Sequence, residues 1–274
     1  MLSIDDLPII SDWNEAVQST FPIRVNFKKS DLIFDYLIRP SDSDSLIVFF
    51  PAAMPQGARR VPSFYRWSYV DNLDHNIICV SDPTLYFSDS MLGGWFVGSK
   101  ENWALLRILE DIKSFAKIRG VKKIIFSGAS LGGFASLMAA DLLLNDEDAS
   151  AFKVRYIAEN PQVTLIKYLW INHIKFLLDK IFNVDSFNGL TESELGRFCL
   201  SKLVGVSRKF SAKGFAIFKE SDAHHFDLQR NELSLISDAN VIIVKIPTVF
   251  DSTGHTPLAQ SFFHFLVQSI DWND

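Results

Sequence analysis

Cysteine is almost absent from this sequence, which has only Cys79 and Cys199 among its 274 residues. Small secreted domains that depend on disulfides need a larger, paired set of cysteines, so that class of protein is excluded. Cys79 falls in a stretch typical of a strand, and Cys199 falls in one typical of a helix. We expect both to be reduced residues that pack inside the protein.

Long apolar runs and an excess of positive charge are also missing. No apolar run reaches membrane-spanning length, so we expect no transmembrane segment. The formal net charge is −5 and is spread along the chain, which argues against nucleic-acid binding. The N-terminus, residues 1–6, carries acidic residues where a signal peptide carries basic ones. These features predict a cytoplasmic protein.

Apolar residues, by contrast, are plentiful: hydrophobic residues make up 48% of the chain, and 24 residues are phenylalanine. A chain of this length is most simply one domain, here residues 1–274, with a large core. Short continuous apolar runs are typical of parallel strands buried on both faces. These runs are 45–50, 76–80, 123–126, 154–158, 214–218 and 241–244.

Other patterns place further elements around those strands. Alternating apolar residues at 23–27 and 32–38 predict an antiparallel hairpin. Helical spacing of apolar residues over 105–118, followed by Gly120, predicts a helix between the second and third runs. The aromatic-rich stretch of about 162–212 predicts a helical, cap-like insertion. The expected fold class is α/β, with a mostly parallel, doubly wound sheet and an antiparallel start.

The stretch Gly128-Ala129-Ser130-Leu131-Gly132 follows an apolar run and precedes a helical pattern. A G-x-S-x-G sequence between a strand and a helix is typical of a nucleophile elbow, a sharp turn that presents a serine. A strained turn residue needs neighbours without Cβ atoms so that strand and helix can approach closely. We predict that Ser130 is a nucleophile. The alternative is a glycine-rich turn with an incidental serine.

A serine nucleophile needs a base that accepts its proton and an acid that orients the base. In this arrangement the acid and then the histidine follow later strands. His255 lies in a glycine-containing loop before the last helical stretch, and it is the predicted base. Asp222 follows the fifth apolar run and is the predicted acid. Its alternatives are Glu220, Asp227 and Asp251.

The transition state of acyl transfer also needs two donors for a developing oxyanion, usually backbone N–H groups. One would belong to Leu131, directly after the serine. The other would belong to Ala52 or Ala53, in the loop after the first apolar run. For residues 51–53 the alternative is a plain turn.

The adjacent histidines His224 and His225, beside Asp227, suggest a metal site at first sight. Adjacent histidines in an extended segment point in opposite directions, and no cysteine or second histidine cluster completes a ligand set. We therefore predict no metal and no tightly bound cofactor.

From about Asp31 to the C-terminus the chain resembles the α/β-hydrolase superfamily. The resemblance rests on the serine elbow, followed later in the chain by an acid and a histidine. Shorter segments resemble a bacterial group associated with capsule and surface-polysaccharide gene clusters. They are Ser63-Phe64-Tyr65-Arg66-Trp67-Ser68-Tyr69, Ser81-Asp82-Pro83-Thr84-Leu85-Tyr86, Gly94-Trp95-Phe96-Val97-Gly98 and Glu159-Asn160-Pro161-Gln162. Members of that group include polysaccharide O-acetyltransferases that use a serine triad and acetyl-CoA.

These segments fall in loops at the carboxyl edge of the predicted sheet, where open α/β sheets bind ligands. We predict that Trp67 and Trp95 stack on sugar rings. Asn160 and Gln162 are predicted to hydrogen-bond sugar hydroxyls. The alternative is aromatic packing and loop capping. Candidates to contact the phosphates of CoA are Arg59, Arg60 and Arg66.

The resemblance and the order of the three residues together predict an O-acetyltransferase. It would move an acetyl group from acetyl-CoA to a hydroxyl of a capsular or surface polysaccharide. One alternative is a carboxylesterase or deacetylase, in which water resolves the acyl-enzyme. Another is a non-catalytic partner in a glycan-assembly complex. The sequence leaves a homo-oligomer open.

Overall fold

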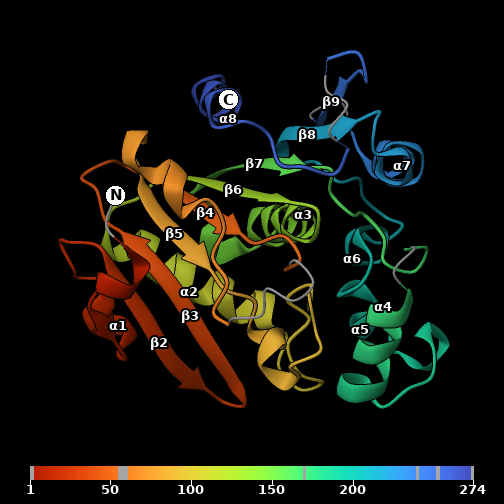
Figure 1. The fold of residues 1–274 in the computed structure, drawn as a ribbon, viewed down its shortest axis with the longest axis horizontal. Helices are drawn as coiled ribbons and strands as arrows, with labels where there is room; N and C mark the ends of the chain where they lie inside the picture. The colour runs from red at the N-terminus through yellow and green to blue at the C-terminus, as the bar shows by residue number, and fades with distance from the viewer. Residues whose placement is uncertain (1–2, 55–60, 169–170, 239–240, 251–253, 273–274) are drawn as a thin grey trace.

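The computed structural model describes residues 3–54, 61–168, 171–238, 241–250 and 254–272. Within them, nine strands form one sheet in the order β1-β2-β3-β5-β4-β6-β7-β8-β9 (Figure 1). The strands are β1 Ile9–Ile10, β2 Ile23–Lys29, β3 Leu32–Arg39, β4 Ser45–Phe50, β5 Asn76–Val80, β6 Lys123–Ala129, β7 Lys153–Glu159, β8 Lys213–Lys219 and β9 Val241–Ile246. The helices are α1 Trp13–Ala16, α2 Ala104–Ile118, α3 Leu131–Leu144, α4 Ile171–Leu177, α5 Glu192–Gly196, α6 Leu200–Val204, α7 Arg230–Ile236 and α8 Gln260–Gln268.

The sheet is parallel apart from β3, which pairs antiparallel with β2 on one side and with β5 on the other. The predicted hairpin is present as β2 and β3, and each predicted apolar run is a strand. From β4 to β9 each neighbouring pair is parallel. The predicted fold class, a mostly parallel α/β sheet with an antiparallel start, is therefore confirmed.

Side chains alternate between two apolar layers because successive strand residues face opposite sides of a sheet. In β4, Val48 packs in one layer with residues of α2 and α3, whereas Phe49 packs in the other with residues of α8. The rings of Phe49 and Phe263 of α8 lie 5.6 Å apart. Figure 1 shows α8 on the opposite side of the sheet from α2 and α3. Both cysteines are free and buried, as predicted.

Helices α4, α5 and α6 occupy the segment between β7 and β8, where the sequence predicted a helical insertion. They gather at one end of the molecule, away from β2 and β3 (Figure 1). Arg197 joins this segment to the loop after β5: its guanidinium donates to the carbonyl oxygens of Val97 at 3.1 Å and Ser99 at 2.6 Å. None of the helices in the described ranges has the length and apolar character needed to cross a membrane.

Candidate active site

Ser130 occupies a strained turn between β6 and α3. Its backbone has φ 54° and ψ −114°, a combination that residues with a side chain rarely adopt. The turn is fixed from two sides, since the Ser130 N–H donates to the Glu159 carbonyl at 2.8 Å and the Phe134 N–H donates to the Ser130 carbonyl at 3.0 Å. The side chain is therefore presented at the carboxyl end of β6, in the geometry of a nucleophile elbow.

The two glycines of the elbow are required by close backbone contacts. A Cβ atom on Gly128 would lie 2.4 Å from the backbone of Gly132. A Cβ atom on Gly132 would lie 2.2 Å from the carbonyl oxygen of Phe50 and 2.7 Å from that of Pro51. Because neither contact tolerates a side chain, the start of α3 is pressed against the loop that follows β4.

That contact places the start of α3 beside the loop that carries the predicted oxyanion donors. Leu131 is the first residue of α3, so its N–H has no acceptor within the helix. Ala52 and Ala53 follow β4, and in the described part of the chain no acceptor is recorded for their N–H groups. The elements that carry Leu131 and Ala52 touch through Gly132. Their role as an oxyanion hole remains a prediction.

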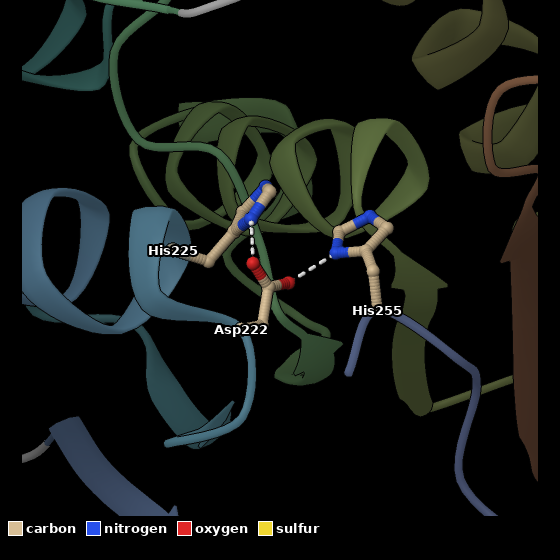
Figure 2. A group of neighbouring side chains, drawn as sticks. All are labelled: Asp222, His225 and His255. Carbon is tan, nitrogen blue, oxygen red and sulfur yellow. Dashed lines mark hydrogen bonds and ion pairs between the residues drawn. The ribbon is translucent and has the colours of Figure 1, made fainter. Parts of the chain in front are cut away.

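Asp222 and His255 meet at the same edge of the sheet as Ser130. The aspartate follows β8 and the histidine follows β9, and carboxyl ends of adjacent parallel strands share one edge. Figure 2 shows the His255 Nδ1 directed at Oδ2 of Asp222, with which it hydrogen-bonds. The Asp222 side chain is 10% exposed and that of His255 is 43% exposed. An acid and a histidine are thus paired as a triad requires.

The pKa of the Asp222 carboxyl group is strongly lowered. Burial opposes its ionisation, but the hydrogen bonds from His225 and His255 outweigh burial and hold the pKa of Asp222 well below its usual value. Of the alternative acids, Glu220 accepts from the Thr248 N–H at 3.3 Å, which gives it a loop-capping contact. Asp251 lies outside the described residues.

Buried charges anchor the loop that carries His255. Glu159, at the end of β7, accepts from the Leu258 N–H at 2.7 Å and forms an ion pair with Arg66 at 2.5 Å. Lys219 donates from Nζ to the Thr256 carbonyl at 2.7 Å. The loop is therefore held against β7 and β8 by residues that follow His255 closely in the sequence.

These contacts correct the expectation that Arg66 meets CoA phosphates. Its side chain is 2% exposed, and its guanidinium lies 4.3 to 4.9 Å from the ring centres of Tyr65, Tyr69 and Phe263. An arginine enclosed in this way pairs with Glu159 and offers no surface to a phosphate. Arg59 and Arg60 lie outside the described residues.

A second imidazole reaches the acid, and the sequence prediction missed it. His225 is 4% exposed, and its Nδ1 lies 3.0 Å from Oδ1 of Asp222. The expectation of an extended segment here is wrong: the chain turns helical after Asp222, with a π-helical turn over His225–Gln229. A helical turn brings residues three positions apart to one side. That spacing between acid and histidine was the available signal.

Gln162 joins Ser130 to His225. The Gln162 Nε2 lies 2.9 Å from Oγ of Ser130, 3.0 Å from Nε2 of His225 and 3.2 Å from the hydroxyl of Tyr168. Its Oε1 accepts from the indole N–H of Trp95 at 3.4 Å. The side chain is buried beside the nucleophile, so its predicted role in contacting a sugar hydroxyl is still open.

Trp95 is held in place by a loop built on Asp82. The carboxylate of Asp82 accepts from the N–H groups of Gly94 at 2.9 Å and Phe96 at 3.2 Å. These bonds accommodate the positive φ of Trp95, 50°. Trp95 is 3% exposed, so the structure gives it a packing and orienting contact with Gln162 in place of an open ring face for a sugar.

The predictions for Trp67 and Asn160 need correction. Trp67 is 7% exposed and packs in the apolar layer that contains α8, on the side of the sheet away from α3. Asn160 is 4% exposed, and its Oδ1 accepts from the Lys219 N–H at 2.9 Å. The Trp67 side chain is therefore engaged in packing, and that of Asn160 in joining β7 to β8.

Asp222, His225 and His255 also offer one metal-ligating atom each, all within 4.8 Å of one another. Their mutual hydrogen bonds satisfy these atoms and account for the arrangement (Figure 2). The expectation that the protein uses no metal stays a prediction.

Comparison with known proteins gives structural matches only. No protein-family model and no curated protein matches the sequence. The capsule O-acetyltransferase of Neisseria meningitidis serogroup A is similar with a TM-score of 0.59 and 15% identity, over 89% of this chain and 94% of that one. Acetyl xylan esterase 1 of Thermoanaerobacterium sp. has a TM-score of 0.55 and 14% identity, over 93% and 90%.

A third match is the Glycosylation Associate Protein complex from Streptococcus agalactiae. Its TM-score is 0.60 at 14% identity, and it covers 89% of this chain and 44% of that one. Identities this low show shared architecture. The strand order, the reversed β3, the elbow after β6 and the neighbouring acetyltransferase and esterase structures agree with one another. The chain has the α/β-hydrolase fold.

Proposed function

We propose that this protein is a serine acyltransferase that moves an acetyl group from acetyl-CoA to a hydroxyl of a capsular or surface polysaccharide. The observation that carries the proposal is the strained Ser130 at the sheet edge where Asp222 bonds His255. A hydroxyl is a weak nucleophile at neutral pH, and this grouping supplies the base and the oriented acid that it needs.

In the first half of the reaction, Oγ of Ser130 attacks the carbonyl carbon of the acetyl thioester. Because Asp222 engages Nδ1 of His255, Nε2 is the ring atom left to accept the Ser130 proton. The carbonyl oxygen takes the negative charge and is stabilised by the N–H groups of Leu131 and of Ala52 or Ala53. The C–S bond then breaks, and the protonated His255 returns the proton to the CoA sulfur.

In the second half, a sugar hydroxyl replaces CoA. His255 accepts its proton while the oxygen attacks the acetyl carbon on Ser130. The bond between the acetyl carbon and Oγ breaks, and Ser130 regains the proton. One acetyl group passes from sulfur to oxygen, and the enzyme returns to its initial state. Acetyl-CoA is a substrate here, and no resident cofactor is needed.

The choice of acceptor is supported by the similarity to the Neisseria capsule O-acetyltransferase and by the segments that resemble the polysaccharide-cluster group. The acetyl xylan esterase favours a second candidate, a carboxylesterase or deacetylase. The same three residues serve both reactions. The difference lies in whether the site admits water or positions an acceptor hydroxyl.

The test uses acetyl-CoA labelled in its acetyl group, together with candidate capsular polymers. Transfer predicts label on the polymer, at a rate well above that of the Ser130→Ala variant. Label released only as acetate would instead establish the esterase. CoA release no faster than in Ser130→Ala would refute both.

A fluorophosphonate probe tests the non-catalytic alternative. Such probes react with activated serines and need no knowledge of donor or acceptor. Labelling of folded protein at Ser130 supports catalysis. An unlabelled but folded protein would favour a partner role in a glycan-assembly complex. Sedimentation of the same sample measures the oligomeric state, which the sequence leaves open.

A further inference from the structure

The acid of this site receives two imidazoles, one on each carboxylate oxygen. His225 bonds Oδ1 of Asp222, and His255 bonds Oδ2 (Figure 2). The rings of the two histidines lie 4.4 Å apart, centre to centre, with an interplanar angle of 30°. The His225 side chain is 6% exposed and that of His255 is 43% exposed. The triad described above uses only the exposed imidazole, so the buried one needs its own explanation.

The hydrogen-bond partners determine which nitrogen of His225 carries the proton. The indole of Trp95 can only donate, so the atom of Gln162 that faces it is the carbonyl Oε1. The Asp222 carboxylate can only accept, so Nδ1 of His225 carries the proton. In the neutral ring Nε2 is then the unprotonated nitrogen, and it lies 3.0 Å from the amide Nε2 of Gln162, which also has Ser130 Oγ at 2.9 Å and the Tyr168 hydroxyl at 3.2 Å.

The charge state of His225 agrees with that assignment. Burial lowers the pKa of His225, which favours the neutral ring with a single N–H. In this form both ring nitrogens are satisfied, one as donor and one as acceptor. The unprotonated Nε2 faces the Gln162 amide, which also contacts Ser130 Oγ, so the role of base stays with His255.

The same network restrains the nucleophile. Gln162 donates to Oγ of Ser130 at 2.9 Å, which occupies a lone pair of the oxygen and leaves the hydroxyl proton free to be donated elsewhere. In the described part of the chain neither histidine bonds Ser130 directly. Gln162 and His225 therefore connect Ser130 with Asp222 through a chain of hydrogen bonds.

We infer that His225 is a positioning residue, which locks the Asp222 carboxylate so that Oδ2 faces His255 and aims the Gln162 amide at the Ser130 oxygen. This inference rests on the proposed function, in that Ser130, Asp222 and His255 are taken as the reacting set. It adds a fourth residue to Ser130, Asp222 and His255. The alignment of both the Asp222 carboxylate and the Ser130 hydroxyl depends on this residue. Without it the carboxylate can rotate about its side-chain bond, and the amide keeps only Ser130 Oγ and the Tyr168 hydroxyl as acceptors.

Two substitutions of His225 test its hydrogen bonds to Asp222 and to Gln162 separately. In His225→Asn the amide can donate near the place of Nδ1, so the bond to Asp222 is kept. In His225→Phe both bonds are lost while the ring volume is retained. The matched control is His224→Asn, since the neighbouring histidine has a buried Nε2 without a hydrogen-bond partner in the described residues.

The readout is the rate of fluorophosphonate labelling at Ser130, per folded molecule as counted by thermal unfolding. We expect His225→Phe to lower this rate about 10- to 100-fold, as small misplacements of reacting groups do. We expect His225→Asn to recover most of it and His224→Asn to stay within about twofold of the unsubstituted protein. Equal rates for the Phe variant and the unsubstituted protein, or an Asn variant no faster than Phe, would overturn the inference.

A spectroscopic measurement keeps this inference separate from the proposed function. Nitrogen-15 NMR of histidine-labelled protein, assigned with the His225→Asn variant, reports the tautomer of the ring. A proton on Nδ1 is expected, and a proton on Nε2 would overturn the inference whatever the activity. If the unsubstituted protein shows the expected tautomer but is not labelled at Ser130, the proposed function fails instead.

Discussion

Gly132 shows how little freedom the elbow allows a single position. Its α-carbon faces the carbonyl oxygens of Phe50 and Pro51, and an added Cβ would lie 2.2 Å from the first of them. Backbone cannot move aside as a flexible side chain can. The close approach also sets Leu131 beside the loop of Ala52, so the same glycine serves stability and the predicted oxyanion site.

We therefore expect Gly132→Ala to lower the free energy of unfolding by about 1 to 3 kcal/mol, the usual cost of overpacking. Urea denaturation measures it. Gly196→Ala is the control, because the nearest atom to its added Cβ would be 3.9 Å away. A Gly132 variant as stable as the control would contradict the close contact.

Asp222 predicts a specific dependence of stability on pH. Its pKa is held below the unfolded value of about 3.9, so its ionised form stabilises the folded state. This stabilisation is complete above the unfolded pKa and is lost as pH falls through the folded pKa. The difference in unfolding free energy between the unsubstituted protein and Asp222→Asn should accordingly shrink on acidification below about pH 4.

Urea titrations of both proteins between neutral and strongly acidic pH provide the measurement. A difference that stays constant or grows as the pH falls would mean that the two histidines do not stabilise the carboxylate.

The sequence predicted some of these residues better than others. Ser130, Asp222 and His255 follow parallel strands, and such strand ends meet at one edge whatever the loops do. His225 was missed because its contact depends on a helical turn after the acid, where the pattern suggested an extended segment. The burial of Trp67 depends on packing in the apolar layer that contains α8, which no local pattern encodes.

The loop after β9 shows how elements distant in the chain hold one another. Glu159 ends β7, accepts from the Leu258 N–H and pairs with the buried Arg66. A glutamine at position 159 has one acceptor oxygen and cannot serve both partners. It would also leave the arginine charge buried without compensation, which is costly in a dry interior.

Glu159→Gln is expected to lower the free energy of unfolding by about 3 kcal/mol. It should also slow fluorophosphonate labelling about tenfold, because the loop carrying His255 loses an anchor. Denaturant unfolding and the labelling rate are the measurements. Replacing both charges, in the double variant Arg66→Met with Glu159→Gln, should restore part of the stability. A double variant less stable than the single one would contradict this account of the pair.

Strands β4 to β8 were predictable from the sequence because parallel strands buried on both faces leave continuous apolar runs. Strand β9 was predicted in the same way, although its residues are partly or fully exposed, and the two-residue β1 was not predicted. The segment between β7 and β8 was predictable as helical, since its aromatic residues follow no strand pattern. The way this segment attaches was not predictable, because Arg197 binds carbonyl oxygens 100 and 98 residues earlier, and such a contact has no signature in local sequence.

Across the whole molecule, the candidate site is assembled from the carboxyl ends of neighbouring strands of one sheet. β4 leads to the loop of the predicted oxyanion donors, β6 to the predicted nucleophile, β7 to Gln162, β8 to the predicted acid and β9 to the predicted base. The site therefore depends on these five strands lying side by side. Its residues are spread over most of the chain, yet the topology brings them to one edge.

The most direct test of the central claim is to trap the acyl-enzyme. Purified protein is mixed with acetyl-CoA, quenched in acid and digested, and the peptide containing Ser130 is examined by mass spectrometry while released CoA is quantified. The account predicts one acetyl group on Ser130, with a matching burst of free CoA, and neither in Ser130→Ala. A folded, unsubstituted protein that releases no more CoA than Ser130→Ala, or that carries the acetyl group on another residue, would contradict it.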